Sequence, residues 1–308
     1  MSTVTRCGYV AIIGRPNVGK STLLNTLMGK KISIISAKPQ TTRNQILGIK
    51  TNEAIQVVYM DTPGLHHAEK RAMNRYMNRL ASSVIIDADV IVFLVEATGW
   101  NDDDDMILKK ISSTNAPVLL VINKVDKLKD KKLLLPVIEK YKEKFNFTHI
   151  VPISAQRAIN IDSLEKTIMQ MLPEGVHLFS DEQITDKNTP FQVAERIREK
   201  LISHTGQELP YSTTVVVDSM QEKEGLLHIS AVIWVEREGQ KPIVIGKNGE
   251  RLKSIGTAAR KDIVKLLGRK IFLHLWVKVK SNWTNDERVL GSLGFSPLGP
   301  LGEGDERS

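Results

Sequence analysis

The segment GRPNVGKS, residues 14–21, constrains the fold more than any other stretch of this chain. Its glycines enclose four residues and are followed by Lys20 and Ser21, and an apolar run at 9–14 leads into it. A loop of this pattern turns its backbone N–H groups toward phosphate oxygens when a strand precedes it and a helix follows. Residues 22–29, TLLNTLMG, read as the start of that helix. The segment therefore predicts an α/β domain whose first strand–helix turn binds phosphate.

Further apolar runs alternate with helix-like stretches along the N-terminal part of the chain. They lie at residues 55–61, 90–96, 117–124 and 149–154. Continuous apolar runs of this length are typical of strands buried on both faces, so we expect a mainly parallel sheet with helices on either side. Ligands of such sheets bind at the carboxyl ends of the strands. The polar motifs that follow the strands should therefore form one site.

The first two polar motifs are expected to hold phosphate and magnesium. Lys20 would reach the β and γ phosphates of a nucleotide, and the Ser21 hydroxyl would ligate Mg²⁺. The segment DTPG follows the second buried strand. There Asp61 would hold Mg²⁺ through a water molecule, and the Gly64 N–H would bond the γ-phosphate, so that the loop senses its loss.

A polar loop at residues 38–45, KPQTTRNQ, carries two adjacent threonines and shows no apolar period. A threonine that ligates Mg²⁺ only while the γ-phosphate is present is a common ordering switch. We expect this threonine to be Thr42 rather than Thr41. Together with Lys20 and Gly64, it would act on the reacting phosphate.

The segment NKVD, which begins at Asn123, indicates the base. Asp126 can accept hydrogen bonds from both N1–H and the exocyclic amine of guanine, whereas adenine offers an acceptor and a C–H at these places. The site should therefore select GTP over ATP. Asn123 and Lys124 would tie the base loop to the phosphate loop. Ser154 and Ala155, at the end of the last strand, would offer a backbone N–H to guanine O6.

These motifs in this order resemble those of the translation-factor class of P-loop GTPases, and GRPNVGKST, DTPGL and NKVD are similar to the bacterial Era-like family. The resemblance implies a GTPase that binds GTP or GDP with Mg²⁺. The predicted nucleotide contacts all lie in these motifs: Gly14, Arg15, Pro16, Asn17, Val18, Gly19, Lys20, Ser21, Thr22, Asp61, Thr62, Pro63, Gly64, Leu65, Asn123, Lys124, Val125, Asp126, Ser154 and Ala155.

Two residues bear on the rate of hydrolysis. Leu65 stands where many GTPases carry a glutamine that orients the attacking water, and a leucine cannot form that hydrogen bond, so slow intrinsic turnover is expected. Asn17 matches the asparagine with which potassium-activated relatives hold K⁺. The resemblance therefore implies K⁺ as a further ligand, placed where an arginine would otherwise neutralise charge.

Positive charge is concentrated in the C-terminal half. Residues 241–280 hold 11 Lys and Arg against two acids, a balance of +9 in a chain whose net charge is +8. Such an island is typical of a protein that binds a polyanion, either nucleic acid or an anionic membrane surface.

Residues 191–280 read as helix, two strands, two short helices at 247–256 and 258–267, and a strand. The segment GKNG in their middle cannot be a second nucleotide loop, because Gly246 and Gly249 enclose only two residues. Order and loop are similar to a type II KH domain, in which two small residues let an RNA backbone approach closely. The expected RNA contacts surround the loop: Ile245, Gly246, Lys247, Asn248, Gly249, Arg251 and Lys253.

A GTPase domain joined to such a KH domain resembles the ribosome-assembly members of the Era-like family. This resemblance implies that the protein binds the 3′ end of 16S ribosomal RNA during maturation of the small subunit, with possible peripheral association with the inner membrane. Two alternatives stay open: a signalling GTPase at the membrane surface, and an RNA chaperone in which GTP is mainly structural.

Composition sets further limits. The single Cys7 excludes a disulfide framework and a zinc site built on cysteines. No run of about 18 apolar residues and no secretory signal pattern is found, so we expect a cytoplasmic protein. We also expect it to be a monomer.

The expected domains are 1–172 (GTPase), 173–190 (linker) and 191–283 (KH), followed by a tail at 284–308. Among the tryptophans, Trp283 is expected to stack on bases, whereas Trp234 and Trp276 lie in strand patterns and are expected in the core.

Overall fold

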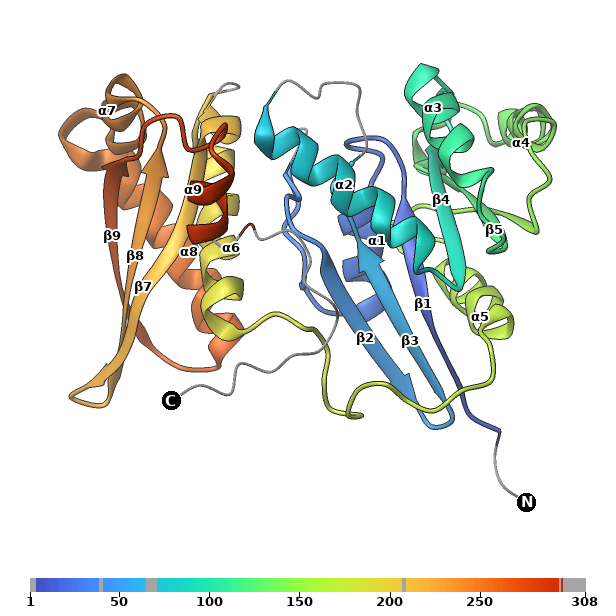
Figure 1. The fold of residues 1–308 in the computed structure, drawn as a ribbon, viewed down its shortest axis with the longest axis horizontal. Helices are drawn as coiled ribbons and strands as arrows, with labels where there is room; N and C mark the ends of the chain where they lie inside the picture. The colour runs from blue at the N-terminus through green and yellow to red at the C-terminus, as the bar shows by residue number, and fades with distance from the viewer. Residues whose placement is uncertain (1–3, 39–40, 65–70, 207–208, 294, 296–308) are drawn as a thin grey trace.

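The computed structural model describes residues 4–38, 41–64, 71–206, 209–293 and 295. It has two parts that lie side by side, an α/β domain with a six-stranded sheet and a smaller α+β domain with a three-stranded sheet (Figure 1). The fold class predicted from the sequence is confirmed.

The first sheet has the strand order β2-β3-β1-β4-β5-β6. Its strands are β1 (Arg6–Ile13), β2 (Ile46–Asn52), β3 (Ile55–Asp61), β4 (Val90–Glu96), β5 (Val118–Asn123) and β6 (His149–Pro152). All neighbours pair in parallel except β2, which is antiparallel to β3. The edge strand β2 was not expected from the sequence. Only its first four positions are buried, and the last three are half-buried or exposed, so it has no long apolar run.

Five helices cover this sheet on both faces. They are α1 (Lys20–Met28), α2 (Ala72–Ile86), α3 (Asp102–Ile111), α4 (Leu134–Lys142) and α5 (Ile161–Met171). Alternate residues of β1 enter opposite cores: Val10 and Ile12 pack with α1 and α5, whereas Ala11 and Ile13 pack with α2, α3 and α4. Both faces of the strand are buried, which explains the continuous apolar runs of the sequence.

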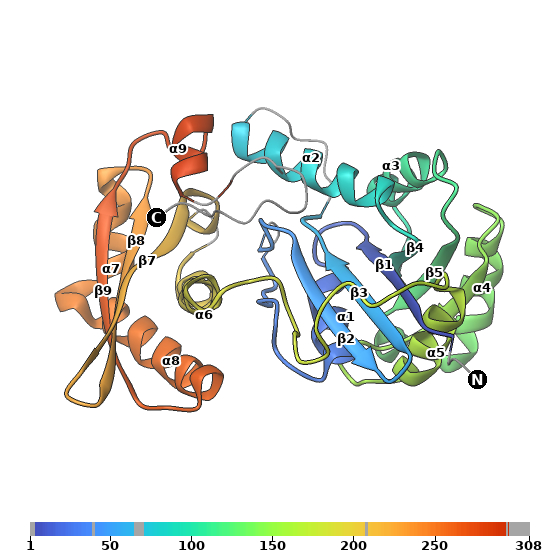
Figure 2. The same cartoon turned by 60° about the horizontal axis from the view of Figure 1, so that its bottom comes forward.

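The second domain follows the order helix, two strands, two helices, strand. Its elements are α6 (Thr189–His204), β7 (Thr213–Lys223), β8 (Leu226–Val235), α7 (Lys241–Ile245), α8 (Glu250–Leu267) and β9 (Ile271–Val279). β8 pairs antiparallel with β7 and parallel with β9. In Figure 2, α6 and α8 lie on the side of this sheet that faces the first domain.

The predicted pair of helices at 247–256 and 258–267 is wrong, because α8 runs unbroken from Glu250 to Leu267. The other helix, α7, precedes the glycine loop instead. A glycine inside a helix costs only about 1 kcal/mol, so Gly256 does not end α8. An added Cβ at Gly256 would lie 3.4 Å from Leu275 Cδ1, which shows that this glycine lets α8 pack closely on β9.

The C-terminal part of the chain contacts the first domain. Helix α9 (Glu287–Ser292) lies within the stretch expected as a tail, and it packs near α2 (Figure 1). Trp283 is 0 % exposed and shares a cluster with Met77, Leu290 and Phe295. The expectation that Trp283 stacks on bases is therefore wrong, since its ring is sealed between the two domains.

Candidate nucleotide site and glycine loop

The phosphate loop is folded around the buried Lys20. Its Nζ donates hydrogen bonds to Gly14 O at 2.8 Å and Arg15 O at 2.9 Å. Burial lowers the pKa of Lys20 to about 8, an effect that the nearby Asp61 carboxylate partly opposes. Gly19, at φ 112°, leads directly into α1. Among the described residues no carboxylate forms an ion pair with Lys20, and a buried cation of this kind at the start of a helix fits an anion such as a phosphate.

A cluster of hydroxyl groups and one carboxylate lies beside this loop. Ser21 Oγ donates to Asp61 Oδ2 at 2.7 Å, and Ser33 Oγ donates to the same oxygen at 2.9 Å. Burial raises the pKa of Asp61, and the Ser21 bond opposes this rise. The other oxygen, Oδ1, is buried without a hydrogen-bond partner among the described residues. An unpaired carboxylate oxygen beside a serine hydroxyl fits a hydrated Mg²⁺.

The two threonines of the polar loop point to different places. Thr42 Oγ1 lies 2.9 Å from Ser21 Oγ, whereas Thr41 Oγ1 donates to Lys38 O at 2.7 Å, within its own loop. Only Thr42 therefore shares the hydroxyl cluster. Ser33 belongs to the same cluster but has no motif that would have revealed it in the sequence.

Gly64 lies against the phosphate loop. An added Cβ would come within 2.8 Å of Pro16 N, so only glycine allows this approach. The preceding Thr62 is buried, and its hydroxyl donates to Ile12 O at 3.4 Å. Leu65, which follows Gly64, lies outside the described residues.

Asn123 and Lys124 join the base end of the site to the phosphate loop. Asn123 Nδ2 donates to Val18 O at 2.9 Å, and Lys124 Nζ donates to Asn17 O at 2.8 Å. Lys124 also forms an ion pair with Glu96. Glu96 ends β4 outside every motif, so this role could not be predicted from a motif.

The backbone N–H groups predicted to read guanine O6 have other acceptors in this structure. Ser154 N donates to Ile159 O at 3.2 Å, and Ala155 N donates to Asn123 Oδ1 at 3.0 Å. Gln156 follows them and lines the same cavity, although no motif includes it. Asp126 also lines the cavity, and its Oδ2 lies 3.7 Å from Arg157 Nε.

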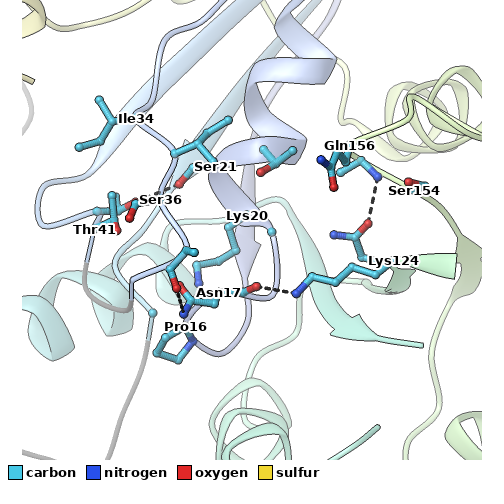
Figure 3. Close-up of a pocket in the computed structure, with 18 of the residues that line it drawn as sticks. Pro16, Asn17, Lys20, Ser21, Ile34, Ser36, Thr41, Lys124, Ser154 and Gln156 are labelled. Carbon is cyan, nitrogen blue, oxygen red and sulfur yellow. Dashed lines mark hydrogen bonds between the residues drawn. The ribbon is translucent and has the colours of Figure 1, made fainter. Parts of the chain in front are cut away.

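These groups border one cavity of about 340 Å³ (Figure 3). Most predicted contacts line it: Pro16, Asn17, Gly19, Lys20, Ser21, Thr22, Thr42, Gly64, Asn123, Lys124, Asp126, Ser154 and Ala155. The remaining described ones are not part of the lining: Gly14, Arg15, Val18, Asp61, Thr62, Pro63 and Val125. Among these, Arg15 pairs with Glu96 at 3.2 Å and Asp104 at 3.4 Å. Residues 34–37 also line the cavity and were not predicted.

The glycine loop of the second domain is exposed and tightly turned. Gly246 has φ 76°, and an added Cβ there would lie 2.7 Å from Arg251 Cβ. Lys247 and Asn248 are exposed at the tip, between α7, which ends at Ile245, and α8, which follows Gly249. Arg251 and Lys253 are exposed on the first turn of α8. The loop thus presents backbone and cations together.

Helix α6 contacts the loop that carries the threonines. Arg198 Nη2 donates to Thr41 O at 2.5 Å, and Lys38 Nζ donates to Ile202 O at 2.5 Å. Close by, Ile35 N donates to Glu199 Oε1 at 3.1 Å. The threonine loop therefore lies between the nucleotide cavity and the second domain.

A second contact joins α2 to the residues after β9. Met73 N donates to Thr284 O at 3.1 Å, and the rings of Tyr76 and Phe295 meet edge to face at 6.0 Å. Helix α2 begins soon after the DTPG loop. The threonine loop and α2, the helix that follows the DTPG motif, thus both contact the second domain.

Within the described ranges, no helix has the length and apolar character needed to cross a membrane.

Family models match both parts of the chain. Residues 9–124 match the family described as 50S ribosome-binding GTPase, and residues 208–284 match the KH domain family. Proteins named GTPase Era from Haemophilus influenzae and Marinobacter nauticus are 56 % and 52 % identical to this chain. The first alignment covers 94 % of this chain and 97 % of the relative, and the second covers 95 % and 96 %.

Solved structures show the same likeness over both domains. Era in complex with MgGDPNP and nucleotides 1506–1542 of 16S ribosomal RNA superposes with a TM-score of 0.92 and 42 % identity, covering 95 % of this chain and 99 % of that one. A variant of Aquifex aeolicus Era bound to GDP and AlF4⁻ gives the same TM-score and identity, covering 95 % of this chain and 100 % of that one.

Proposed function

This chain belongs to the GTPase Era family, and from that premise we propose that it binds the 3′ end region of 16S ribosomal RNA under the control of the bound nucleotide. As a member of this family it hydrolyses GTP to GDP and phosphate. Its role is that of a switched factor in the assembly and maturation of the small ribosomal subunit, as the complex of its structural relative with this RNA suggests.

In the proposed site, GTP occupies the cavity with its phosphates at the start of α1. Lys20 binds the β and γ phosphates, where a buried cation offsets charge most strongly. Mg²⁺ supplies further charge neutralisation, held by Ser21, Thr42 and, through water, Asp61. Asp126 accepts two hydrogen bonds from guanine. The Gly64 N–H contacts the γ-phosphate and shifts when it leaves.

RNA is bound by the second domain around Lys247. The glycine loop allows a strand backbone to approach, and the cations of α8 neutralise its phosphates. An open groove between α6 and α8 is bordered by Lys200, Lys253, Lys261 and Lys265, and by two acids, Glu250 and Asp262, of which Asp262 pairs with Lys200. This groove extends the basic surface away from the loop and supports a polyanion as the ligand.

The observation that carries the proposed control is the contact between α6 and the threonine loop. When the γ-phosphate and Mg²⁺ hold Thr42, the loop takes one arrangement, and Lys38 and Thr41 transmit it to α6. Hydrolysis frees Thr42, so the carbonyl contacts of α6 change with it. The affinity of the second domain for RNA then depends on the nucleotide.

We expect RNA affinity to differ about tenfold between the GDPNP-bound and GDP-bound protein, a coupling of typical size. Fluorescence anisotropy with labelled nucleotides 1506–1542 measures both constants. Lys38→Met removes the bonds to α6 and should bring the ratio toward one while leaving nucleotide affinity within about twofold. Lys109→Met, an exposed lysine on α3, is the matched control. Equal RNA affinity in the two nucleotide states of the unaltered protein would end the proposal.

Intrinsic hydrolysis is slow, below about 1 s⁻¹, and RNA raises it. We propose that a K⁺ ion bound beside Asn17 of the phosphate loop speeds hydrolysis. Asn17 has φ 62° and donates from Nδ2 to Ala37 O at 2.8 Å, so its side-chain oxygen Oδ1 is the atom that would face a cation. Hydrolysis should be about tenfold faster in KCl than in NaCl, and Asn17→Ala should remove the difference. Equal rates in the two salts would exclude the potassium site.

Peripheral association with the inner membrane belongs to the same proposal. The basic α8 could meet anionic lipid headgroups as well as RNA, because both are polyanions. Flotation of the full chain with phosphatidylglycerol vesicles tests this association. Competition by the RNA shows whether the two ligands share the glycine-loop surface. A membrane-bound protein with no affinity for RNA would favour the signalling alternative.

A further inference from the structure

The three-stranded sheet of the second domain has two unlike faces. Residues of β9 alternate, so Ile271 and Val277 enter the core with α8 while Phe272 and Trp276 face the other way. Phe272 is 46 % exposed and Trp276 is 54 % exposed. The expectation from the sequence that Trp276 lies in the core is therefore wrong. Large exposed rings at alternate positions are costly unless another molecule covers them.

Four rings form a continuous row, which we call the aromatic face: the half-buried His228 and the exposed Phe272, His274 and Trp276. The centroids of His228 and Phe272 are 5.0 Å apart, and those of Phe272 and His274 are 5.9 Å apart. His274 and Trp276 lie parallel at 5.0 Å, with an interplanar angle of 3°. Three of these rings therefore follow β9 as neighbouring platforms, and His228 lies beside them on β8.

The charged side chains of the two strands that carry the aromatic face, and of the residue after β9, are lysines. Lys278 and Lys280 lie over the ring of Trp234 at 5.9 Å and 5.6 Å. The strand residues 226–235 and 271–280 contain two lysines and no carboxylate. Flat rings flanked by cations are the chemistry with which proteins bind single-stranded nucleic acid, because bases stack on the rings and phosphates meet the cations.

The aromatic face lies on the side of the sheet opposite α8, so it is separate from the glycine loop and from the groove along α8. The two surfaces are nevertheless adjacent. β9 is the edge strand of its sheet, and α7, which leads into the glycine loop, contacts β9. A strand that leaves the loop can therefore pass around the edge of β9 onto the aromatic face.

We propose that the aromatic face is a second RNA-binding surface, on which unpaired bases beyond the glycine loop stack against Phe272, His274 and Trp276. The proposal rests on the proposed function for its ligand class and goes beyond it in the site. Stacking tolerates any base, so this surface adds affinity and length to the contact while the glycine loop fixes its position.

The test separates the two surfaces by RNA length. Overlapping ten-nucleotide RNAs that tile nucleotides 1506–1542 identify the strongest short ligand of the full-length protein, and twelve uridines are then added at either end. We expect the uridines at one end to raise affinity about tenfold or more, the gain expected from stacked bases. The double substitution Phe272→Ala with Trp276→Ala should remove this gain and leave the affinity for the ten-nucleotide RNA within twofold.

Matched variants distinguish stacking from other causes. Phe272→Leu with Trp276→Leu keeps apolar side chains without rings, so it too should remove the gain, and thermal melting checks that both double variants fold. Ile86→Ala alters an apolar side chain of the first domain that is 81 % exposed, and it should keep the gain. Lys247→Ala should weaken the short RNA itself, which tests the proposed function separately. 4-Thiouridine in the added segment should crosslink to residues 271–280.

Two outcomes would overturn the proposal. One is that neither uridine extension raises affinity in the unaltered protein. The other is that the gain survives in the alanine or leucine variants, which would place the added nucleotides elsewhere, for example on the lysines of α8.

Discussion

Asp126→Asn should exchange guanine for xanthine as the preferred base. The asparagine NH₂ would face the guanine amine, donor against donor, so one charge-assisted hydrogen bond is lost and another weakened. Each hydrogen bond to a charged group contributes about 1.5–3 kcal/mol, so GTP affinity should fall about 100-fold or more. Xanthine carries a carbonyl in place of that amine and accepts from the asparagine, so XTP affinity should rise by a similar factor.

Competition of GTP and XTP against a fluorescent GDP analogue measures both changes. Asp130→Asn is the matched control, because Asp130 is an exposed acid in the same segment after β5. Its side chain accepts a hydrogen bond from Lys132 N, and an asparagine can still accept that bond. Because Asp126 borders the cavity but holds no phosphate in the proposed site, Mg²⁺ dependence should not change. If the Asp126 variant bound GTP as tightly as the unaltered protein, another group would read the base.

A double substitution in the glycine loop, Lys247→Asp with Asn248→Asp, should abolish most RNA binding. It changes the charge at the loop tip by about three units and sets carboxylates against the phosphates that the loop approaches, so affinity should fall about 100-fold or more. Asn248 has φ 50°, a conformation that aspartate tolerates, so the loop itself should persist.

Titrations at several salt concentrations should also show a shallower dependence on salt, by about one unit of slope for the lost lysine contact. Lys223→Asp places a carboxylate at the far end of the same sheet and should leave RNA affinity near its original value. Basal GTP hydrolysis should stay unchanged in both variants. RNA affinity that survived the loop substitution would move the binding surface away from the glycine loop.

Most of the residues that line the cavity could be predicted from the sequence because they lie in short motifs. The backbone between Gly14 and Ser21 must turn in one way whatever the rest of the chain does, and the parallel strands bring the later motifs to the same edge. What escaped prediction depends on tertiary contacts. Glu96, Ser33 and Gln156 join the site through packing and follow no fixed spacing.

The aromatic face shows a different limit. Nearly every position of β9 is apolar or aromatic, so hydrophobicity alone does not tell which residues face the core. A weaker signal was present, because His274, Lys278 and Lys280 share the parity of Trp276. Polar residues at alternate positions mark the solvent side of a strand, and Trp276 lies on that side. Trp283 follows the strand, where no parity applies.

Two of the contacts between the domains have a mechanical consequence. The KH domain contacts the threonine loop through α6, and the residues around Trp283 contact α2. If one of these contacts breaks, the other still holds the domain, so free rotation of the domain requires both to break. In the proposed cycle both depend on the same phosphate group, whose loss would weaken them together.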